Sequence, residues 1–332
     1  MAMFGDLVVQ LDPWQVEYGA ELPFEDLAEA ADDDVAAVDI ELASDVWRAI
    51  RPDQATRLTQ IIFIDGVRRV EARLIIRRQD RLCHGAFGSH AVGAVRVVNT
   101  EVFFAESRVT RLLVVGAGES IGMAVPVKPD LLYQPLSTAD THPDAPLRVL
   151  QEDMRIEEER LGRDLANAGD ALVIADGPLS FEDTSRSPVL GYIKRIFKLY
   201  LPRERLGLLA ALRVGERTPL FALRSSRRFS RFSWFMRLAD PFPGASDLAG
   251  IARLEVSEIV GAEAARRLAD ASTAILPRFV PSRWRDPRSP QNLLPIGAME
   301  TALRRQMGDG RLIRRHIETL IATEARGARR RY

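Results

Sequence analysis

The sequence has few of the cysteines and none of the long apolar runs that are typical of disulfide-stabilised, zinc-finger or membrane-spanning proteins. Among its 332 residues there is one cysteine, Cys83, so no internal disulfide can form, and no second cysteine completes a zinc site with His84. No apolar run approaches the roughly 18 residues of a membrane span, and the first ten residues lack the pattern of a secretion signal. We therefore expect a cytoplasmic protein with no membrane partner and with Cys83 in the core or on a strand face.

An excess of one charge is also missing. Lys and Arg together number 46, as do Asp and Glu, so the net charge gives no sign of a nucleic-acid partner. The charges are unevenly placed, however, because residues 21 to 45 are acidic while 224 to 237 and 311 to 331 are rich in arginine. With 46% hydrophobic residues, the chain can form a substantial core in one elaborated domain or in two.

The chain divides most naturally near residue 58. Residues 24 to 50 combine apolar residues at imperfect helical spacing with many acids, which predicts a helical segment. Pro52 and a polar run to Thr59 separate this segment from the apolar run that begins at Ile61. We expect an N-terminal helical extension over 1–58, a main domain over 59–325 and a basic tail over 326–332.

Residues 61 to 125 contain several short apolar runs with few polar residues between them, which predicts an antiparallel meander. The first run ends in Asp65 and Gly66, a turn-forming pair, so we expect Asp65 at a strand end. The glycines at 116, 118 and 122 superficially match a dinucleotide-binding loop. Because Pro126 comes so soon after them, a helix cannot open there to hold a pyrophosphate, and we expect a hairpin or loop.

Residues 147 to 168 form the clearest predicted helix, with apolar residues spaced by three and four. Glu158 lies on that apolar stripe, where a charge is costly unless it reaches solvent or faces a group that needs a carboxylate. The helix leads to a short apolar strand, residues 171 to 175, that places Asp176 before a Gly-Pro turn. Asp176 is either a turn-former or a functional carboxylate at a strand end, where loops meet.

Residues 225 to 238 interleave arginines with aromatic residues, among them Arg231, Trp234 and Arg237. Such a pattern suits contact with a single nucleic-acid strand, since arginines bind phosphates and aromatic rings stack on bases. A strand with alternating faces that packs on a core would have the same composition, and the sequence does not separate these two interpretations.

The order of these elements suggests a metal site. A meander, then a helix, then a strand beside the first strand would bring Asp65, Asp176 and a helix glutamate to one sheet edge. Carboxylates so close together need cations to neutralise them, and oxygen ligands favour Mg²⁺ or Mn²⁺. A pair of such ions supports in-line attack of water on a phosphodiester. The expected fold is mixed α/β: a ribonuclease H-like core with a mixed, largely antiparallel sheet flanked by helices, plus N-terminal and C-terminal helical additions.

Several segments in this order resemble the NurA nucleases. They are IFIDGVRR at 62–69, ADGPL at 175–179, GYIK at 191–194, FSWFMRL at 232–238 with GIARLEV at 250–256, and NLLPIGAMETAL at 292–303. The resemblance covers roughly residues 60 to 325. It implies that the main domain is a NurA-like deoxyribonuclease that uses Mn²⁺ or Mg²⁺, acts as a homodimer and partners a HerA-type hexameric ATPase in DNA end resection and repair, as a 5′–3′ exonuclease and single-strand endonuclease.

The resemblance also implies roles for individual residues. Asp65 and Asp176 match the two metal-binding aspartates of the family, and Lys194 matches a lysine near the scissile phosphate. For the metal-binding glutamate, periodicity favours Glu158 and the offset from Asp176 keeps Glu159 as a rival. The residues expected to contact DNA are Arg68, Arg69, Arg231, Trp234, Arg237, Trp284 and Arg285.

This chain departs from the family in one respect. Archaeal members have a histidine in the segment equivalent to residues 295 to 300, and this chain has none there. Either Glu300 supplies a fourth ligand or the site works with three carboxylates. The alternative function is therefore a catalytically weak or inactive DNA-binding or clamp subunit of the same fold.

Overall fold

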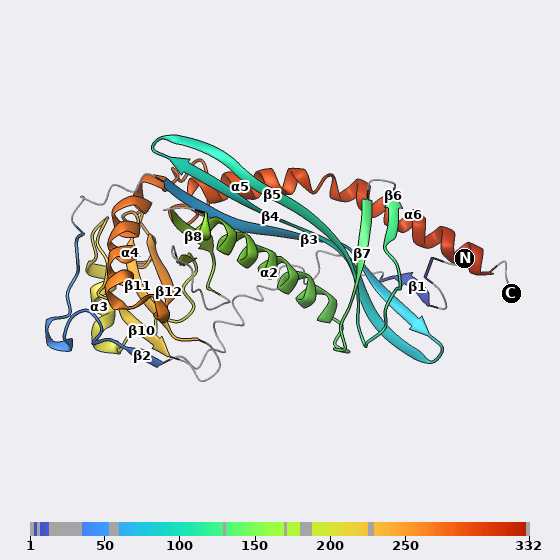
Figure 1. Ribbon diagram of the computed structural model, residues 1–332, viewed down its shortest axis with the longest axis horizontal. Coiled ribbons are helices and arrows are strands. Elements are labelled where there is room, and N and C mark those ends of the chain that lie inside the picture. The colour runs from blue at the N-terminus through green and yellow to red at the C-terminus, as the bar shows by residue number, and fades with distance from the viewer. Residues whose placement is uncertain are drawn as a thin grey trace.

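The computed structural model describes residues 3–4, 7–12, 35–52, 60–128, 131–168, 171–179, 188–224 and 229–329. Within these ranges, 12 strands form one mixed sheet and helices pack on both of its faces (Figure 1). The chain thus has the mixed α/β architecture predicted from its sequence.

The elements have these bounds. The strands are β1 (Val8–Leu11), β2 (Val35–Ala37), β3 (Gln60–Arg78), β4 (Arg81–Val98), β5 (Glu101–Val115), β6 (Val125–Lys128), β7 (Leu131–Ser137), β8 (Leu172–Asp176), β9 (Val189–Ile193), β10 (Phe221–Arg224), β11 (Arg231–Arg237) and β12 (Ile251–Ser257). The α-helices are α2 (Ala145–Asn167), α3 (Leu206–Ala211), α4 (Ala262–Ile275), α5 (Leu294–Gln306) and α6 (Gly310–Arg329), and the 3₁₀ helices are η1 (Ser44–Val46), η2 (Arg203–Arg205), η3 (Glu258–Val260) and η4 (Leu276–Phe279).

The sheet is built around the long strands β3, β4 and β5, which pair antiparallel as the predicted meander. The strand order is β2-β10-β11-β12-β9-β8-β3-β4-β5-β7-β6, with β1 also paired to β3. β8 joins β3 in parallel and β9 joins β8 in parallel, while most other pairs are antiparallel. The predicted helix over 147–168 is α2, and the loop that contains Gly116 and Gly118 connects β5 to β6 without a helix.

One expectation about β3 is wrong, because this strand does not end at Asp65. It continues through Gly66 to Arg78, since β4 pairs with it along its whole length and Val67, Leu74 and Ile76 are buried. Cross-strand pairing and burial therefore outweigh the turn preference of the Asp-Gly pair. Asp176, by contrast, is the last residue of β8, as predicted.

The two faces of β3 are covered by different helices. Phe63 and Val67 belong to a core cluster that includes residues of α5, whereas Ile62 and Ile64 belong to a cluster that includes residues of α2. Figure 1 shows α5 and α2 on opposite sides of the long strands. Because side chains alternate along a strand, Asp65 lies on the face of α5.

The helix expected over 24–50 is wrong for residues 35–50, while residues 24–34 lie outside the described ranges. Residues 35–37 form β2, which pairs with β10, and the 3₁₀ turn η1 comes after it. Ala36 and Ala37 pack against different core clusters, so this segment needs apolar residues on both sides, as a strand provides. The buried Arg217 donates to both carboxylate oxygens of Glu41, at 2.7 and 2.8 Å. The division at residue 58 stays a prediction.

The C-terminal part forms the helix expected from the sequence. α6 continues to Arg329, and residues 330–332 of the predicted basic tail lie outside the described ranges. Cys83 is buried in a cluster with Ile313 and Ile317 of this helix, which confirms its place in the core. None of the described helices is long and apolar enough to cross a membrane.

The arginine-aromatic segment forms an interior strand rather than a surface for nucleic acid. In β11, between β10 and β12, the exposed fraction is 2% for Arg231, 0% for Trp234 and 2% for Arg237. The guanidinium of Arg237 donates to main-chain carbonyls of Leu209, Ala210, Leu212, Asp247 and Ala249. These three side chains are therefore not placed to contact DNA, and the core-strand interpretation holds. Arg227 and Arg228 lie outside the described residues.

This burial predicts that Arg237→Ala lowers the free energy of unfolding by at least about 3 kcal/mol, because several buried carbonyls lose their donor. Arg224→Ala is the matched control: its side chain is 58% exposed and pairs with Glu258, so the cost should stay below about 1 kcal/mol. Urea denaturation measures both. Equal, small losses would contradict the structural role of Arg237.

Candidate metal centre

The candidate site lies where β8 ends beside β3. β8 pairs with β3 through Ile61–Ile64, and β1 pairs with the same edge of β3 only from Leu74 onward. Between these two pairings, no strand in the described part of the chain covers that edge of β3. Side chains from α2 and α5, on opposite faces of the sheet, therefore have access to the region beside Asp65.

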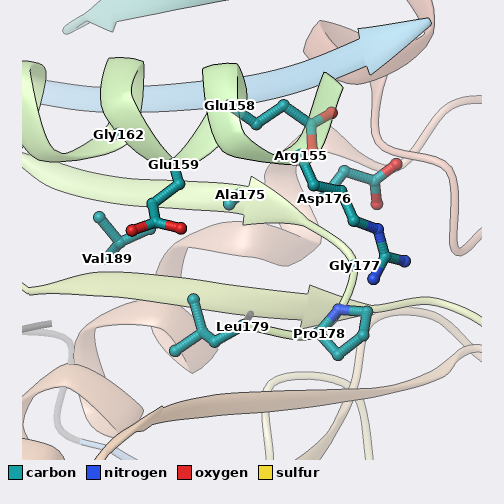
Figure 2. A pocket seen from close by; sticks show the side chains of 10 residues that line it. All are labelled: Arg155, Glu158, Glu159, Gly162, Ala175, Asp176, Gly177, Pro178, Leu179 and Val189. Atoms are coloured by element: carbon teal, nitrogen blue, oxygen red, sulfur yellow. The ribbon is translucent and has the colours of Figure 1, made fainter. Parts of the chain in front are cut away.

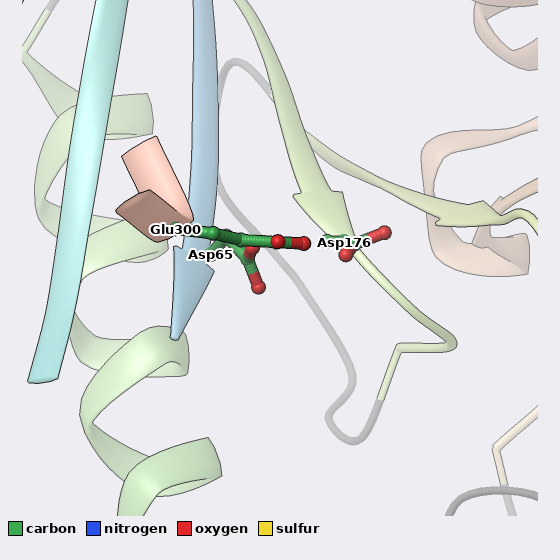
Figure 3. Close-up of side chains that lie close together, drawn as sticks. All are labelled: Asp65, Asp176 and Glu300. Atoms are coloured by element: carbon green, nitrogen blue, oxygen red, sulfur yellow. The ribbon is translucent and has the colours of Figure 1, made fainter. Parts of the chain in front are cut away.

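Three carboxylates meet at this edge. Asp65 of β3, Asp176 of β8 and Glu300 of α5 each offer an oxygen atom, and these atoms all lie within 4.8 Å of one another (Figure 3). Their environment is largely closed, since Asp65 is 7% and Glu300 9% exposed. The Asp65 carboxylate also accepts a hydrogen bond of 2.8 Å from the main-chain amide of Gly66.

Charge repulsion in this cluster acts most clearly on Asp65. Burial raises the pKa of Asp65 well above its ordinary value, and the neighbouring Asp176 raises it further, as do Glu158 and Glu300. Lys194 acts in the opposite direction. The carboxylates of this site therefore have more negative charge than Lys194 alone can balance. A divalent cation would relieve the repulsion between them.

Glu158 and Glu159 leave α2 in different directions (Figure 2). The Glu158 carboxylate lies over Gly66, where an added Cβ would come 2.3 Å from its oxygen, so a larger residue there would displace this carboxylate. Glu159 points toward Val189 and pairs with Arg163 on the same helix. The structure thus brings Glu158, the residue favoured by periodicity, next to Asp65. Glu159 points away from Asp65.

Lys194 occupies the space between the carboxylates. Its ammonium group is 2.5 Å from Asp176 Oδ2 and 3.6 Å from Glu300 Oε1, and it donates to Asn292 Oδ1 at 2.7 Å. Burial alone would lower the pKa of Lys194, but the charges of Asp176 and Asp65 outweigh it and raise this pKa. Lys194 is therefore positively charged within the cluster.

The donor set fits a small, hard divalent cation. All the converging ligand atoms are carboxylate oxygens, the type that Mg²⁺ and Mn²⁺ prefer. Beside them, a pocket of about 30 Å³ is lined by Glu158, Glu159 and Asp176, among others, which is enough for at least one water molecule. Asp65, Asp176 and Glu300 are the residues that would hold a cation, with Glu158 adjacent.

Residues 281–293 complete the site through contacts that the sequence did not predict. These residues lie between η4 and α5. From this segment Arg288 reaches Glu300 and Asn292 reaches Lys194, while Asp286 accepts hydrogen bonds from both Arg288 and Asn292. Asn292 stands at the start of a stretch used for the resemblance, but its partner Lys194 is 98 positions away along the chain. No local pattern reveals such a contact.

The remaining residues predicted to contact DNA fall into two groups. Arg68 donates to Gln151 at 2.5 Å, and Arg69 donates to the carbonyls of Met307 and Gly308, so both are held by the protein. Trp284 is 98% exposed and Arg285 is also exposed. Of the residues predicted to contact DNA, Trp284 and Arg285 are therefore accessible.

Comparison with known proteins shows a similarity in structure but none in sequence. No protein-family model matches the sequence, and no curated protein matches it. The crystal structure of the NurA nuclease from Sulfolobus solfataricus is similar to this chain with a TM-score of 0.48 and 12% identity, over 84% of this chain and 88% of that one. Similarity at this level does not assign a family or an activity.

Burial and the neighbouring carboxylates raise the pKa of Asp65, which predicts that Asp65→Asn raises the melting temperature in the presence of EDTA. A carboxyl group whose pKa is raised by folding destabilises the folded state once it ionises, so the gain should appear as the pH rises above about 4 and grow until Asp65 is ionised in the folded protein. Asp164→Asn, an exposed position on α2, should change nothing. A lower melting temperature for Asp65→Asn at pH 8 would contradict the repulsion.

Glu158 and Glu159 make a matched pair for a second test. In the wild-type protein, Mn²⁺ at about 100 times its dissociation constant should add about 2.7 kcal/mol to the free energy of unfolding. Glu158→Gln should reduce this gain, because its carboxylate lies next to Asp65, whereas Glu159→Gln should leave it intact. Thermal shift with increasing Mn²⁺ measures the difference, and the reverse order would show that the helix glutamate is Glu159.

Proposed function

We propose that this protein is a divalent-metal-dependent deoxyribonuclease. The observation that supports this function is the convergence of Asp65, Asp176 and Glu300, from two strands and a helix far apart in sequence, on one cluster of oxygen ligands beside Lys194. When bound there, a pair of Mn²⁺ or Mg²⁺ ions would polarise a phosphodiester and activate water for in-line attack.

The chain's own residues divide this work between binding and charge balance. Asp65, Asp176 and Glu300 would hold the cations, and Glu158, which lies over Gly66, would add a carboxylate from the other face of the sheet. Lys194 keeps its proton among these carboxylates and supplies a positive charge for a phosphate oxygen. Helices and strands position the four carboxylates, and Lys194 directly follows β9.

DNA is the proposed substrate because of the sequence resemblance and of an exposed aromatic near the site. Trp284 and Arg285 belong to the same segment as Arg288 and Asn292, which contact the site, and they offer base stacking and phosphate contact to a single strand. We extend the proposal to 5′–3′ exonuclease and single-strand endonuclease activity with Mn²⁺, which the resemblance implies.

The proposed partners are a second copy of the chain and a HerA-type hexameric ATPase, in DNA end resection and repair. Both rest on the sequence resemblance. An apolar surface that could contact a partner protein lies at the hairpin between β4 and β5, where Val102, Phe103 and Phe104 are 59%, 48% and 53% exposed. Sedimentation of the purified chain tests the dimer, and co-purification tests the ATPase.

The second candidate function is a DNA-binding or clamp subunit with weak or no catalysis. It is favoured by one observation, the ion pair between Glu300 and Arg288, which neutralises a ligand carboxylate within the chain itself. Binding of DNA without cleavage in the presence of Mn²⁺ would select this function.

The nuclease proposal predicts Mn²⁺-dependent cleavage of labelled DNA that Asp65→Ala and Asp176→Ala each reduce more than about 100-fold, since even outer partners of metal ligands cost about 10- to 100-fold. Circular dichroism checks that both variants fold, and Glu159→Gln serves as the active control. Full cleavage by both aspartate variants would refute the proposed site.

A further inference from the structure

Arg288 makes an unusual division of its hydrogen bonds at the edge of the carboxylate cluster. One nitrogen, Nη1, donates to both oxygens of Glu300, at 3.0 Å to Oε1 and 2.8 Å to Oε2. The other two, Nε and Nη2, donate to the two oxygens of Asp286, at 3.3 and 3.2 Å. Arg288 thus has two independent anionic partners, and one of them belongs to the candidate metal centre.

Asp286 is fixed without help from the metal ligands. It accepts a hydrogen bond of 2.8 Å from Asn292 Nδ2 and another of 2.8 Å from the main-chain amide of Arg288. Asn292 is fully buried and in turn accepts from Lys194. Asp286 can therefore keep hold of Arg288 when the contact with Glu300 is lost.

Burial differs sharply across the Arg288–Glu300 pair. The Glu300 side chain is 12% exposed and comes from a helix packed in the core, whereas the Arg288 side chain is 52% exposed. Glu300 is thus the fixed partner, and Arg288 is the one that can turn toward solvent at low cost. A half-exposed ion pair of this kind is weak, so it holds Glu300 less firmly than a bound divalent cation would.

A divalent cation and Arg288 compete for the same carboxylate. Glu300 Oε1 accepts from Arg288, and the Glu300 carboxylate lies within 4.8 Å of oxygens of Asp65 and Asp176. A cation held by these oxygens would repel the guanidinium. We propose that Arg288 is an exchangeable counter-ion: it neutralises Glu300 in the metal-free protein, yields it when a divalent cation binds, and, still held by Asp286, turns Nη1 to a phosphate of the nucleic acid.

This inference rests on the proposed function for its substrate, but the exchange itself is testable with metal alone. Isothermal titration calorimetry measures Mn²⁺ binding to the wild-type protein, Arg288→Ala, Arg288→Lys and Arg285→Ala. The last variant removes an exposed arginine of the same segment and controls for the general loss of positive charge. Arg288→Ala should bind Mn²⁺ about two- to fivefold tighter than Arg285→Ala, because the weak competing ion pair is gone.

The results separate the exchange from the proposed function. Tighter binding by Arg288→Ala, with Arg288→Lys in between, supports the exchange. Weaker or unchanged binding overturns it and makes Arg288 a positioning residue for Glu300, while the metal centre stands. No Mn²⁺ binding to the wild-type protein overturns both proposals.

The phosphate contact has its own measurement, the affinity for a labelled single-stranded oligonucleotide with EDTA or with Ca²⁺, which prefers the same oxygen ligands. Arg288→Ala should weaken binding about fivefold or more in Ca²⁺ and hardly at all in EDTA, since the arginine is released only when a cation holds Glu300. Arg285→Ala should weaken binding similarly in both conditions. An equal effect of Arg288→Ala in the two conditions would overturn the exchange.

Discussion

The structure around the site depends on one constraint: carboxylates of like charge are held close together at a largely buried sheet edge. In solvent Asp65, Asp176 and Glu300 would ionise without strain, but here their proximity costs stability unless positive charge is supplied. Lys194 supplies positive charge inside the cluster, and Arg288 supplies further positive charge at its edge. Such a cluster of oxygen atoms could hold a metal ion.

Ordinary packing holds the cluster in place. Core clusters on both faces of β3 fix α2 and α5, so Glu158 and Glu300 approach from opposite sides of the same strand. The early end of β8 leaves the edge of β3 open beside Asp65. Glu255, fully buried in β12, accepts a hydrogen bond of 2.8 Å from the amide of Leu179 and so fixes the turn after Asp176.

Much of this arrangement can be predicted from periodicity and short-range signals. The meander, α2, the strand end at Asp176 and the place of Glu158 on the apolar stripe of its helix all come from spacing. The pairing of β8 with β3 comes from the order of the elements. Glu300 is a candidate ligand from the sequence, and the structure places it in the cluster.

The errors share a physical cause, which is that long-range pairing overrides local preference. β3 continues through an Asp-Gly pair because β4 accompanies it, and residues 35–37 join the sheet although their neighbourhood has a helical composition. Arg237 can be buried because its guanidinium donates hydrogen bonds to five main-chain carbonyls. The residues next to it in sequence give no sign of these partners. The contact of Asn292 with Lys194, 98 positions away, likewise joins distant segments.

We propose that this sheet edge binds divalent cations. Crystals of the protein soaked in Mn²⁺ and measured at the manganese absorption edge test this binding. Anomalous density is expected between Asp65, Asp176 and Glu300, with Lys194 displaced from the space it now fills. Density confined to other carboxylates, or its absence at saturating Mn²⁺ with Lys194 still in contact with Asp176, would contradict it.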